Sequence, residues 1–228
     1  MIRSAFGIFF TMFSPSPLEG EGRDGETRAT DNHKLKKLSR KRTEDPMTEP
    51  IKPVRRIVCI DENEKSKCIS DAPSPDVRLD PARPGYASTR IWVTDRTPAR
   101  LKNVRESLNA PHTIEPPPGG SVCRVVTFPP DASYKCKVGA KEVQAFFAAM
   151  GSPAASTYSA KAPHPYMQKT RTLDFCLILE GEITLMLDKE EVHLKAGDTV
   201  VQRGTNHAWS NRSDRPCRIA FSSHDGKY

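Results

Sequence analysis

The chain of 228 residues has no C-x-x-C pair and no other close pairing of its six cysteines. This absence excludes the ligand spacing of a structural zinc site and the framework of a small disulfide-rich domain. We therefore predict reduced cysteines, as in a cytoplasmic protein. Cys176 and Cys217 lie inside apolar runs, where a thiol is usually a small buried side chain rather than a nucleophile.

The sequence also lacks an apolar run long enough to span a bilayer. The N-terminal "MIRSAFGIFFTMF" begins like a signal peptide, but no A-x-A-like cleavage site follows it. Because residues 1–46 are rich in charge and poor in patterned apolar residues, we predict that they are disordered or extraneous and that the natural chain starts at Met47. The alternative is a genuine flexible tail. A chain starting at Met47 is expected to keep the full melting temperature, which thermal denaturation measures.

Aromatic residues are few, at 7%, and the formal net charge of +7 is modest. Part of this charge lies in "HKLKKLSRKR" (33–42), outside any periodic segment, where lysine runs are usually just solvated. The chain has no phosphate-cradling loop, dinucleotide fingerprint or nucleophile elbow. We expect neither nucleic acid nor a membrane as a partner.

What the chain does contain, from Val54 onward, is a series of short β-branched and aromatic runs separated by turn residues. Such a pattern is typical of an all-β sandwich or barrel. Residues 54–60 and 67–70 flank a polar turn and predict a hairpin. The other predicted strands are 86–94, 123–128 and the runs "TLDFCLILEGEI", "TLMLD", "EEVHLKAGD", "TVVQ", "HAWSN" and "CRIAFSS" between Thr170 and the end.

Two segments favour short helices, 99–108 and 140–151. The second has apolar residues at i, i+3, i+4 and i+7 and ends at Gly151, which predicts an amphipathic helix packed on the core. Strands as short as those that follow usually close on themselves, because closure removes exposed edges. Gly197 and Gly204 lie at turns where we expect backbone conformations that side chains disfavour.

The segment "LDFCLILEGEITLMLDKEEVHLKAGDTVVQRGTNHAWSN" resembles the cupin superfamily. Asp174 and Gly181 match the end of the first cupin motif. Gly197, Gly204, His207 and Asn211 match the second. The similarity covers about residues 164–224, and "PPPGGSVCRVVTFPP" with "FFAAMG" resembles a subgroup of small single-domain cupins. The resemblance implies a single jelly-roll β-barrel over residues 47–228, with its core at 164–224 and an N-terminal β arm and helix at 54–151.

In catalytic cupins the first motif resembles H-x-H followed by a glutamate, and these side chains bind a divalent metal with the histidine of the second motif. Here the H-x-H positions fall on Gln168 and Thr170, and Asp174 replaces the glutamate. Amide and hydroxyl oxygens are weak ligands for iron, nickel or zinc. The resemblance thus implies a degenerate metal site of His207, Asp174 and Gln168, with a weakly bound divalent ion (iron, zinc, nickel or manganese) or none.

Several alternatives remain open for the candidate ligand-binding residues Gln168, Thr170, Asp174, His207 and Trp209. The even-numbered Gln168, Thr170 and Asp174 would share one face of a continuous strand. Thr170 and Asp174 could instead satisfy buried groups at a strand start, and His207 could be a lining histidine bonded to a neighbour. Trp209 packs the core or stacks on a ligand. His164 could replace the missing ligand if the chain folds back at Pro165.

We therefore predict a small-molecule-binding cupin of doubtful catalytic activity. One alternative is a metal-dependent enzyme, a decarboxylase, dioxygenase or isomerase acting on a small organic acid or aromatic metabolite, with Asp174 or His207 as general acid or base. The other is a structural cupin without a ligand. The expected partners are a small molecule and, as an option, a second copy of the chain.

Overall fold

The computed structural model describes residues 50–228, which belong to one unit, Glu44–Tyr228. The expectations for residues 1–46 and for a start at Met47 lie outside the described residues. In the described part, no helix has the length and apolar character that crossing a bilayer requires.

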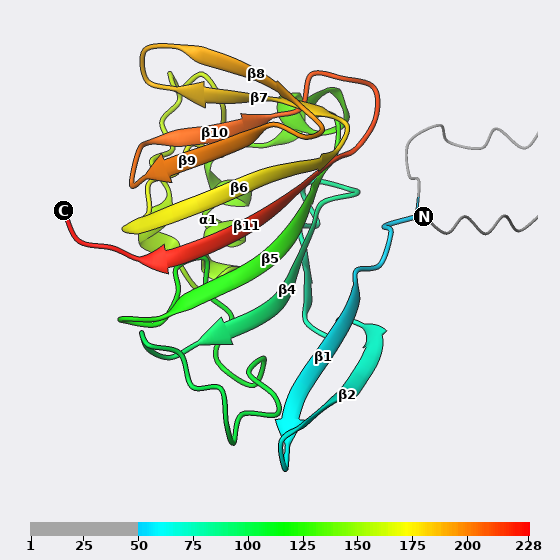
Figure 1. Cartoon of the computed structure of the whole chain (residues 1–228). Helices are drawn as coiled ribbons and strands as arrows, with labels where there is room; N and C mark the ends of the chain where they lie inside the picture. The colour runs from blue at the N-terminus through cyan, green and yellow to red at the C-terminus, as the bar shows by residue number, and fades with distance from the viewer. Residues whose placement is uncertain (1–49) are drawn as a thin grey trace, which may run out of the picture. The chain divides into compact units, whose positions relative to one another are not determined.

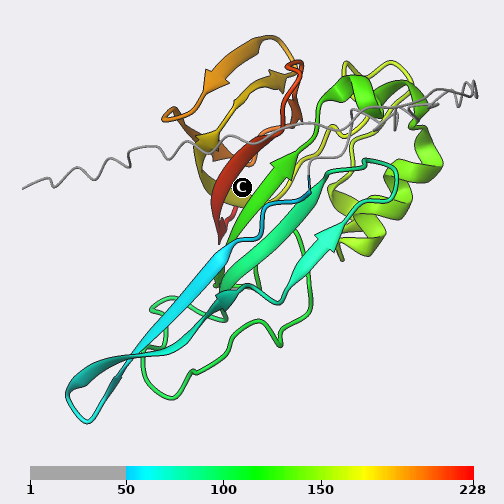
Figure 2. The ribbon, with the colours of Figure 1, turned by 90° about the vertical axis from the view of Figure 1, so that its right-hand side faces the viewer.

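The strands of this part form three antiparallel sheets (Figures 1 and 2). The largest has the order β3-β4-β5-β11-β6-β9, the second has the order β10-β7-β8, and β1 pairs with β2 as a hairpin that extends away from the others. The bounds are β1 Arg55–Glu62, β2 Lys65–Pro73, β3 Val77–Leu79, β4 Ala87–Thr94, β5 Ser121–Phe128, β6 Thr172–Glu180, β7 Glu182–Leu187, β8 Glu191–Lys195, β9 Thr199–Arg203, β10 His207–Ser210 and β11 Cys217–Asp225.

The two larger sheets face each other across an apolar core, which confirms the predicted all-β jelly-roll fold with its N-terminal β arm. The core includes Phe128 of β5 and Ile219 of β11 from one sheet, and Ile183 of β7 and Trp209 of β10 from the other. Alternation along each strand places these side chains inward. Cys176 and Cys217 are buried free thiols, as predicted, and the other four cysteines are also unpaired.

One of the two predicted helices forms. Helix α1, Ala140–Ala149, buries Val143, Phe146 and Phe147 in the core, and three short 3-10 helices lie at Asp131–Ser133, Lys135–Lys137 and Pro153–Ala155. The prediction of a helix at 99–108 is wrong, since these residues form turns and bends.

The side chain of Glu106 explains the missing helix. Its carboxylate accepts hydrogen bonds from the backbone N–H groups of Ser107 and Leu108, at 2.7 and 2.8 Å, and from the guanidinium of Arg56. Leu101, at the start of the expected apolar stripe, is 87% exposed, so this segment has no layer to pack against. Side-chain hydrogen bonds to nearby backbone donors compete with helix formation in this way.

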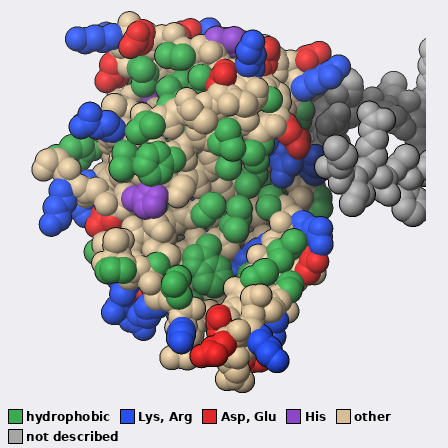
Figure 3. All heavy atoms as spheres, viewed as in Figure 1, with side chains coloured by type: hydrophobic (Ala, Val, Ile, Leu, Met, Phe, Trp, Pro, Cys, Tyr) green, Lys and Arg blue, Asp and Glu red, His purple; other side chains and the backbone are tan. Residues whose placement is uncertain are grey.

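The outer face of the six-stranded sheet carries exposed apolar side chains (Figure 3). Phe175, Leu177 and Leu179 of β6 and Val201 of β9 are between 39% and 59% exposed. Such a patch is compatible with a second copy of the chain, but the homodimer stays a prediction.

Gly204 forms a turn before β10 in the left-handed region, with φ at +64°, and Gly197 has φ at +97°. Both observations confirm the expected backbone conformations. A Cβ on Gly204 would lie 2.9 Å from the ring of Tyr228, whose hydroxyl contacts the carbonyl oxygen of Gly204 at 3.1 Å. Position 197 has the same kind of φ but no atom within 4 Å of the added Cβ.

We expect Gly204→Val to lower the free energy of unfolding by about 2–3 kcal/mol, because a β-branched residue is strained at positive φ and also displaces Tyr228. Gly197→Val is the matched control, since it adds the backbone strain without the collision. Urea denaturation of both variants measures the difference. If the two variants lose equal stability, the contact with Tyr228 contributes nothing.

Candidate functional site

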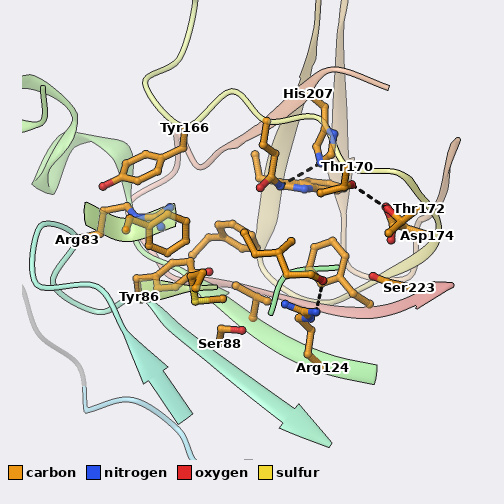
Figure 4. A pocket seen from close by; sticks show the side chains of 18 residues that line it. Arg83, Tyr86, Ser88, Arg124, Tyr166, Thr170, Thr172, Asp174, His207 and Ser223 are labelled. Atoms are coloured by element: carbon orange, nitrogen blue, oxygen red, sulfur yellow. Dashed lines mark hydrogen bonds between the residues drawn. The ribbon is translucent and has the colours of Figure 1, made fainter. Parts of the chain in front are cut away.

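A cavity between the two larger sheets is the candidate site (Figure 4). The centre of a water molecule can move through about 70 Å³ of it, which is room for a few waters or a small organic group. All five predicted ligand-binding residues line this cavity, namely Gln168, Thr170, Asp174, His207 and Trp209. The aromatic residues Tyr86, Phe128 and Phe221 form apolar parts of its wall.

His207 and Gln168 lie side by side through a backbone pairing. The N–H of Gln168 donates to the carbonyl of His207 at 2.8 Å, and the N–H of His207 donates to the carbonyl of Gln168 at 2.9 Å. Gln168 thus pairs with β10 of the smaller sheet, whereas β6 of the opposite sheet begins only at Thr172. The expected continuous strand through Gln168, Thr170 and Asp174 is therefore broken, and these residues meet because the two sheets face each other.

The His207 imidazole has both nitrogens occupied. Its Nδ1 lies 3.0 Å from the carbonyl of Thr205, so Nδ1–H donates there, and its Nε2 lies 3.3 Å from the amide nitrogen of Gln168. In this tautomer Nε2 accepts a hydrogen bond from the amide. Burial lowers the pKa of His207, although the carbonyl of Thr205 and the carboxylate of Asp174 act in the opposite direction. A neutral imidazole therefore faces the cavity.

A chain of hydroxyl groups leads to the carboxylate of Asp174. The Thr172 hydroxyl donates to Asp174 Oδ2 at 2.8 Å, and the hydroxyl oxygens of Thr170 and Thr172 lie 2.8 Å apart. Because the Thr172 proton is directed to Asp174, Thr170 is the donor to Thr172. The sequence reasoning missed Thr172, although its even number places it on the face of Asp174. The hydrogen bond from Thr170 to Thr172 matches the alternative in which Thr170 satisfies a buried group. Thr170, Thr172 and Asp174 nevertheless all line the cavity.

Trp209 combines packing with exposure to the cavity. Its ring lies edge-on to His207, with 5.9 Å between centroids, and edge-on to Phe221, at 5.6 Å. Its buried Nε1 has no hydrogen-bond partner among the described residues. Both alternatives for this residue, core packing and ligand stacking, therefore remain compatible with its position.

The residues at the motif positions do not fit a metal ion of the cupin kind. Residues 50–228 contain no cluster of three or more histidine, cysteine or acidic side chains that could bind one. The lone imidazole of the site uses its Nε2 on Gln168, and the one carboxylate accepts from Thr172. First-row metals bind weakly to such a donor set.

His164 does not replace the missing ligand. Its side chain is fully buried in another cluster, where Nδ1 accepts from the N–H of Tyr166 at 3.2 Å and Nε2 lies 3.5 Å from Asp131 Oδ2. A replacement would require the chain to fold back at Pro165 and bring His164 to the cavity. His164 lies beside Asp131 instead and does not line the cavity.

Sequence reasoning also missed two arginines in the cavity wall. Arg83 and Arg124 both line the cavity and are 3% and 4% exposed. Arg124 follows the inward alternation of Val122, Val126 and Phe128 in β5, which is the signal that could have identified it. Ser88 of β4 lines the same wall, and its buried hydroxyl has no partner among the described residues.

Three histidines with buried side chains, His112, His164 and His207, make the stability depend on pH. Burial is the main cause that lowers their pKa values, for His112 to about 4. The unfolded chain binds protons more readily than the folded one in this range, so stability is full above the ordinary pKa and falls as pH decreases.

We expect the free energy of unfolding to be constant above pH 7 and to fall between pH 6.5 and 4, by roughly 1–3 kcal/mol for His112 alone. Urea titrations at intervals of half a pH unit measure this slope. His112→Gln should flatten it, whereas His193→Gln, on an exposed side chain, should not. A slope that is equal in all three proteins would contradict the assignment to His112.

Comparison with known protein families identifies the class of domain that contains this site. The facing sheets and their central cavity are those of a cupin-type barrel, and residues 159–223 match the family model described as Cupin domain. This part of the chain is a cupin domain, as its motifs predicted.

Short stretches of the chain are similar to two curated fungal proteins. Phomopsin biosynthesis cluster protein C' of Diaporthe leptostromiformis is 54% identical over 48 residues, which are 21% of this chain and 25% of that protein. Oryzines biosynthesis cluster protein J of Aspergillus oryzae is 48% identical over 50 residues, 22% and 28% of the two chains. The matched stretch thus spans about a quarter of the length of these relatives.

Solved structures with a similar arrangement include a putative ethanolamine utilization protein Q from Salmonella typhimurium. It has a TM-score of 0.39 and 11% identity, and the match covers 78% of this chain and all of that one. The cupin domain of Cnp3 from Schizosaccharomyces pombe has a TM-score of 0.36 and 10% identity, over 75% of this chain and 87% of that one.

Proposed function

We propose that this cupin domain binds a small organic molecule in the cavity between its two larger sheets. The observation that carries this proposal is a set of buried polar atoms around the cavity that have no partner within residues 50–228. They belong to four lining residues and are the Ser88 hydroxyl, Nη2 of Arg83, Nε of Arg124 and Nε1 of Trp209. Buried polar groups are almost always hydrogen-bonded, so these atoms suit a ligand or ordered water.

The shape and chemistry of the wall support a small molecule. Aromatic side chains supply apolar area, and a few polar groups converge from opposite sides of the cavity, which is the usual composition of a ligand pocket. In Figure 4, His207 and Thr170 lie on one side, and Ser88 and Arg124 lie on the other. A ligand between them could contact both sheets.

Binding does not require a metal, which favours this reading over the metal-dependent enzyme. Catalysis of decarboxylation, oxygenation or isomerisation in the manner of metal-containing cupins needs more imidazole donors than the cavity supplies. The names of the two fungal relatives refer to biosynthesis clusters, which accords with a small metabolite as ligand. A cytoplasmic location remains a prediction.

A ligand screen with a blocked cavity tests the proposal. A panel of small carboxylates, amines and neutral aromatic compounds is added to the full chain, and the melting temperature is measured by differential scanning fluorimetry. We expect at least one class to raise the melting temperature of the unaltered protein and to have no effect on Ser223→Phe, which places a ring in the cavity.

Ser222→Phe is the matched control, because the neighbouring residue on β11 does not line the cavity. It should respond to ligands like the unaltered protein. If no compound shifts the melting temperature, or if Ser223→Phe still responds, the structural cupin without a ligand becomes the better reading.

A further inference from the structure

Four arginines are buried in the described part of the chain, and three of them have a carboxylate partner. Arg56 pairs with Glu106 at 2.9 Å, Arg83 pairs with Asp80 at 2.6 Å, and Arg90 pairs with Asp76. The fourth, Arg124, forms no ion pair with any residue in 50–228, although it is only 4% exposed. Buried charges are normally paired, so Arg124 is the exception that needs an explanation.

The guanidinium of Arg124 is held in place by the backbone. Its Nη2 donates to the carbonyl oxygens of Thr113, at 3.1 Å, and Ile114. These two bonds fix the orientation of the planar group, while Nε has no partner in the described part of the chain. Burial lowers the pKa of Arg124 to about 10, so the side chain keeps its positive charge at neutral pH. A fixed cation with a free donor therefore borders the cavity.

Neighbouring groups suit a carboxylate at this position. Ser88 lies on the adjacent strand β4, two residues from Arg90, which is the register partner of Arg124. Ser88 lines the same cavity, and its hydroxyl has no partner within residues 50–228. Figure 4 shows Ser88 and Arg124 on one side of the cavity. Guanidinium and hydroxyl donors together match the acceptors of a carboxylate. The rings of Phe128, Trp209 and Phe221 offer apolar contacts for the rest of a ligand.

The carboxylate of Asp174 raises the pKa of Arg124 through its charge, but the two side chains form no ion pair. Asp174 is on β6 and pairs in register with Ser223, while Arg124 is on β5 and pairs with Phe221, so β11 separates them. Two strand spacings correspond to about 10 Å between their backbones. Arg83 also has an unpartnered donor in the described part of the chain, Nη2, but it is less suited to bind an anion. Asp80 already balances its charge, and the rings of Tyr86 and Tyr166 lie against it.

We propose that the ligand of this cavity is a small organic acid whose carboxylate binds the guanidinium of Arg124, with the Ser88 hydroxyl as a second donor. This inference rests on the proposed function, since it names the chemical class of the ligand for the same cavity. Arg124 acts here as a specificity-determining residue. It prefers a carboxylate to an amide of equal size, because only the carboxylate neutralises the buried charge.

Matched pairs of acids and amides test this preference. Acetate, benzoate and phenylacetate are titrated against the full chain by isothermal calorimetry at pH 7, each beside its own primary amide. We expect at least one acid to bind about 10- to 100-fold more tightly than its amide, the range for hydrogen bonds to a charged group. In Arg124→Gln this ratio should approach one, whereas Arg124→Lys should keep part of it.

Arg203→Gln is the control variant, since it removes an exposed arginine of β9 outside the cavity and should leave the ratio unchanged. The acid–amide ratio of the unaltered protein needs no variant, so the test stands even if Arg124→Gln fails to fold.

Two outcomes would overturn the inference. If the amides or the neutral and cationic compounds of the screen bind and the acids have no advantage, the carboxylate assignment is wrong while the proposed function stands. If no compound of either set binds, both are wrong.

Discussion

Gln168→His is expected to raise the affinity of the domain for Zn²⁺ or Ni²⁺ at least roughly tenfold. The backbone pairing of Gln168 with His207 places the two side chains together, with Nε2 atoms 3.3 Å apart, at the cavity that Asp174 also lines. A second imidazole would convert a poor donor set into two imidazoles and a carboxylate. Calorimetric titration of the full chain with each ion measures the change, and elemental analysis of the untreated protein gives the starting occupancy.

Two further variants separate a shared site from a general effect of added histidine. His207→Ala in the Gln168→His background should abolish the gain. Gln144→His adds an imidazole on the exposed side of α1 and should leave affinity unchanged. Stoichiometric metal in the unaltered protein would contradict the account, because it would require a donor that the described residues do not supply.

Asp131→Ala is expected to destabilise the domain by about 3–5 kcal/mol and to lower its melting temperature by roughly 10 °C. The Asp131 carboxylate is buried and accepts from the hydroxyls of Tyr134 at 2.8 Å and Ser210 at 2.6 Å, and from the N–H of Asn211 at 3.2 Å. The alanine variant leaves these buried donors without an acceptor, which costs more than the net value of each bond. Thermal and urea denaturation measure both quantities.

Asp188→Ala is the matched control, because this exposed carboxylate accepts from the amide of Asn206 at the surface. Its loss should cost less than about 1 kcal/mol. If both variants lose equal stability, the hydrogen bonds to Asp131 do not contribute to holding the end of β10 against the loop after β5.

Local pattern was sufficient for most of the fold. Alternation and turn residues predicted the strands that became β4, β5 and β6, and helical spacing predicted α1, because each pattern reports a face that the core must bury. The short strand β3, Val77–Leu79, escaped prediction because all three of its residues are exposed and no alternation marks it. The segment 99–108 has a helical pattern but forms no helix, because it has no apolar surface to pack against.

Identifying the candidate site required both the sequence motif and the tertiary structure. The order and spacing of Asp174, His207 and Asn211 identified the cupin domain, because a motif is a property of the sequence itself. The pairing of Gln168 with His207 of β10 could not be predicted, because these residues are 39 positions apart in the sequence. The next strand after Gln168, β6, belongs to the opposite sheet. Only this long-range backbone pairing places Gln168 beside His207, and the facing of the two sheets brings Asp174 to the same cavity.

The sequence by itself determined the all-β class, the positions of the turns and the weakness of the metal donor set, since these depend on residue types and local spacing. The tertiary structure decided which charges are paired. It directs His164 to Asp131 and leaves Arg124 at the cavity without an ion-pair partner in the described part of the chain. The physical reason is that pairing depends on distances between side chains from different strands, which local sequence patterns do not specify.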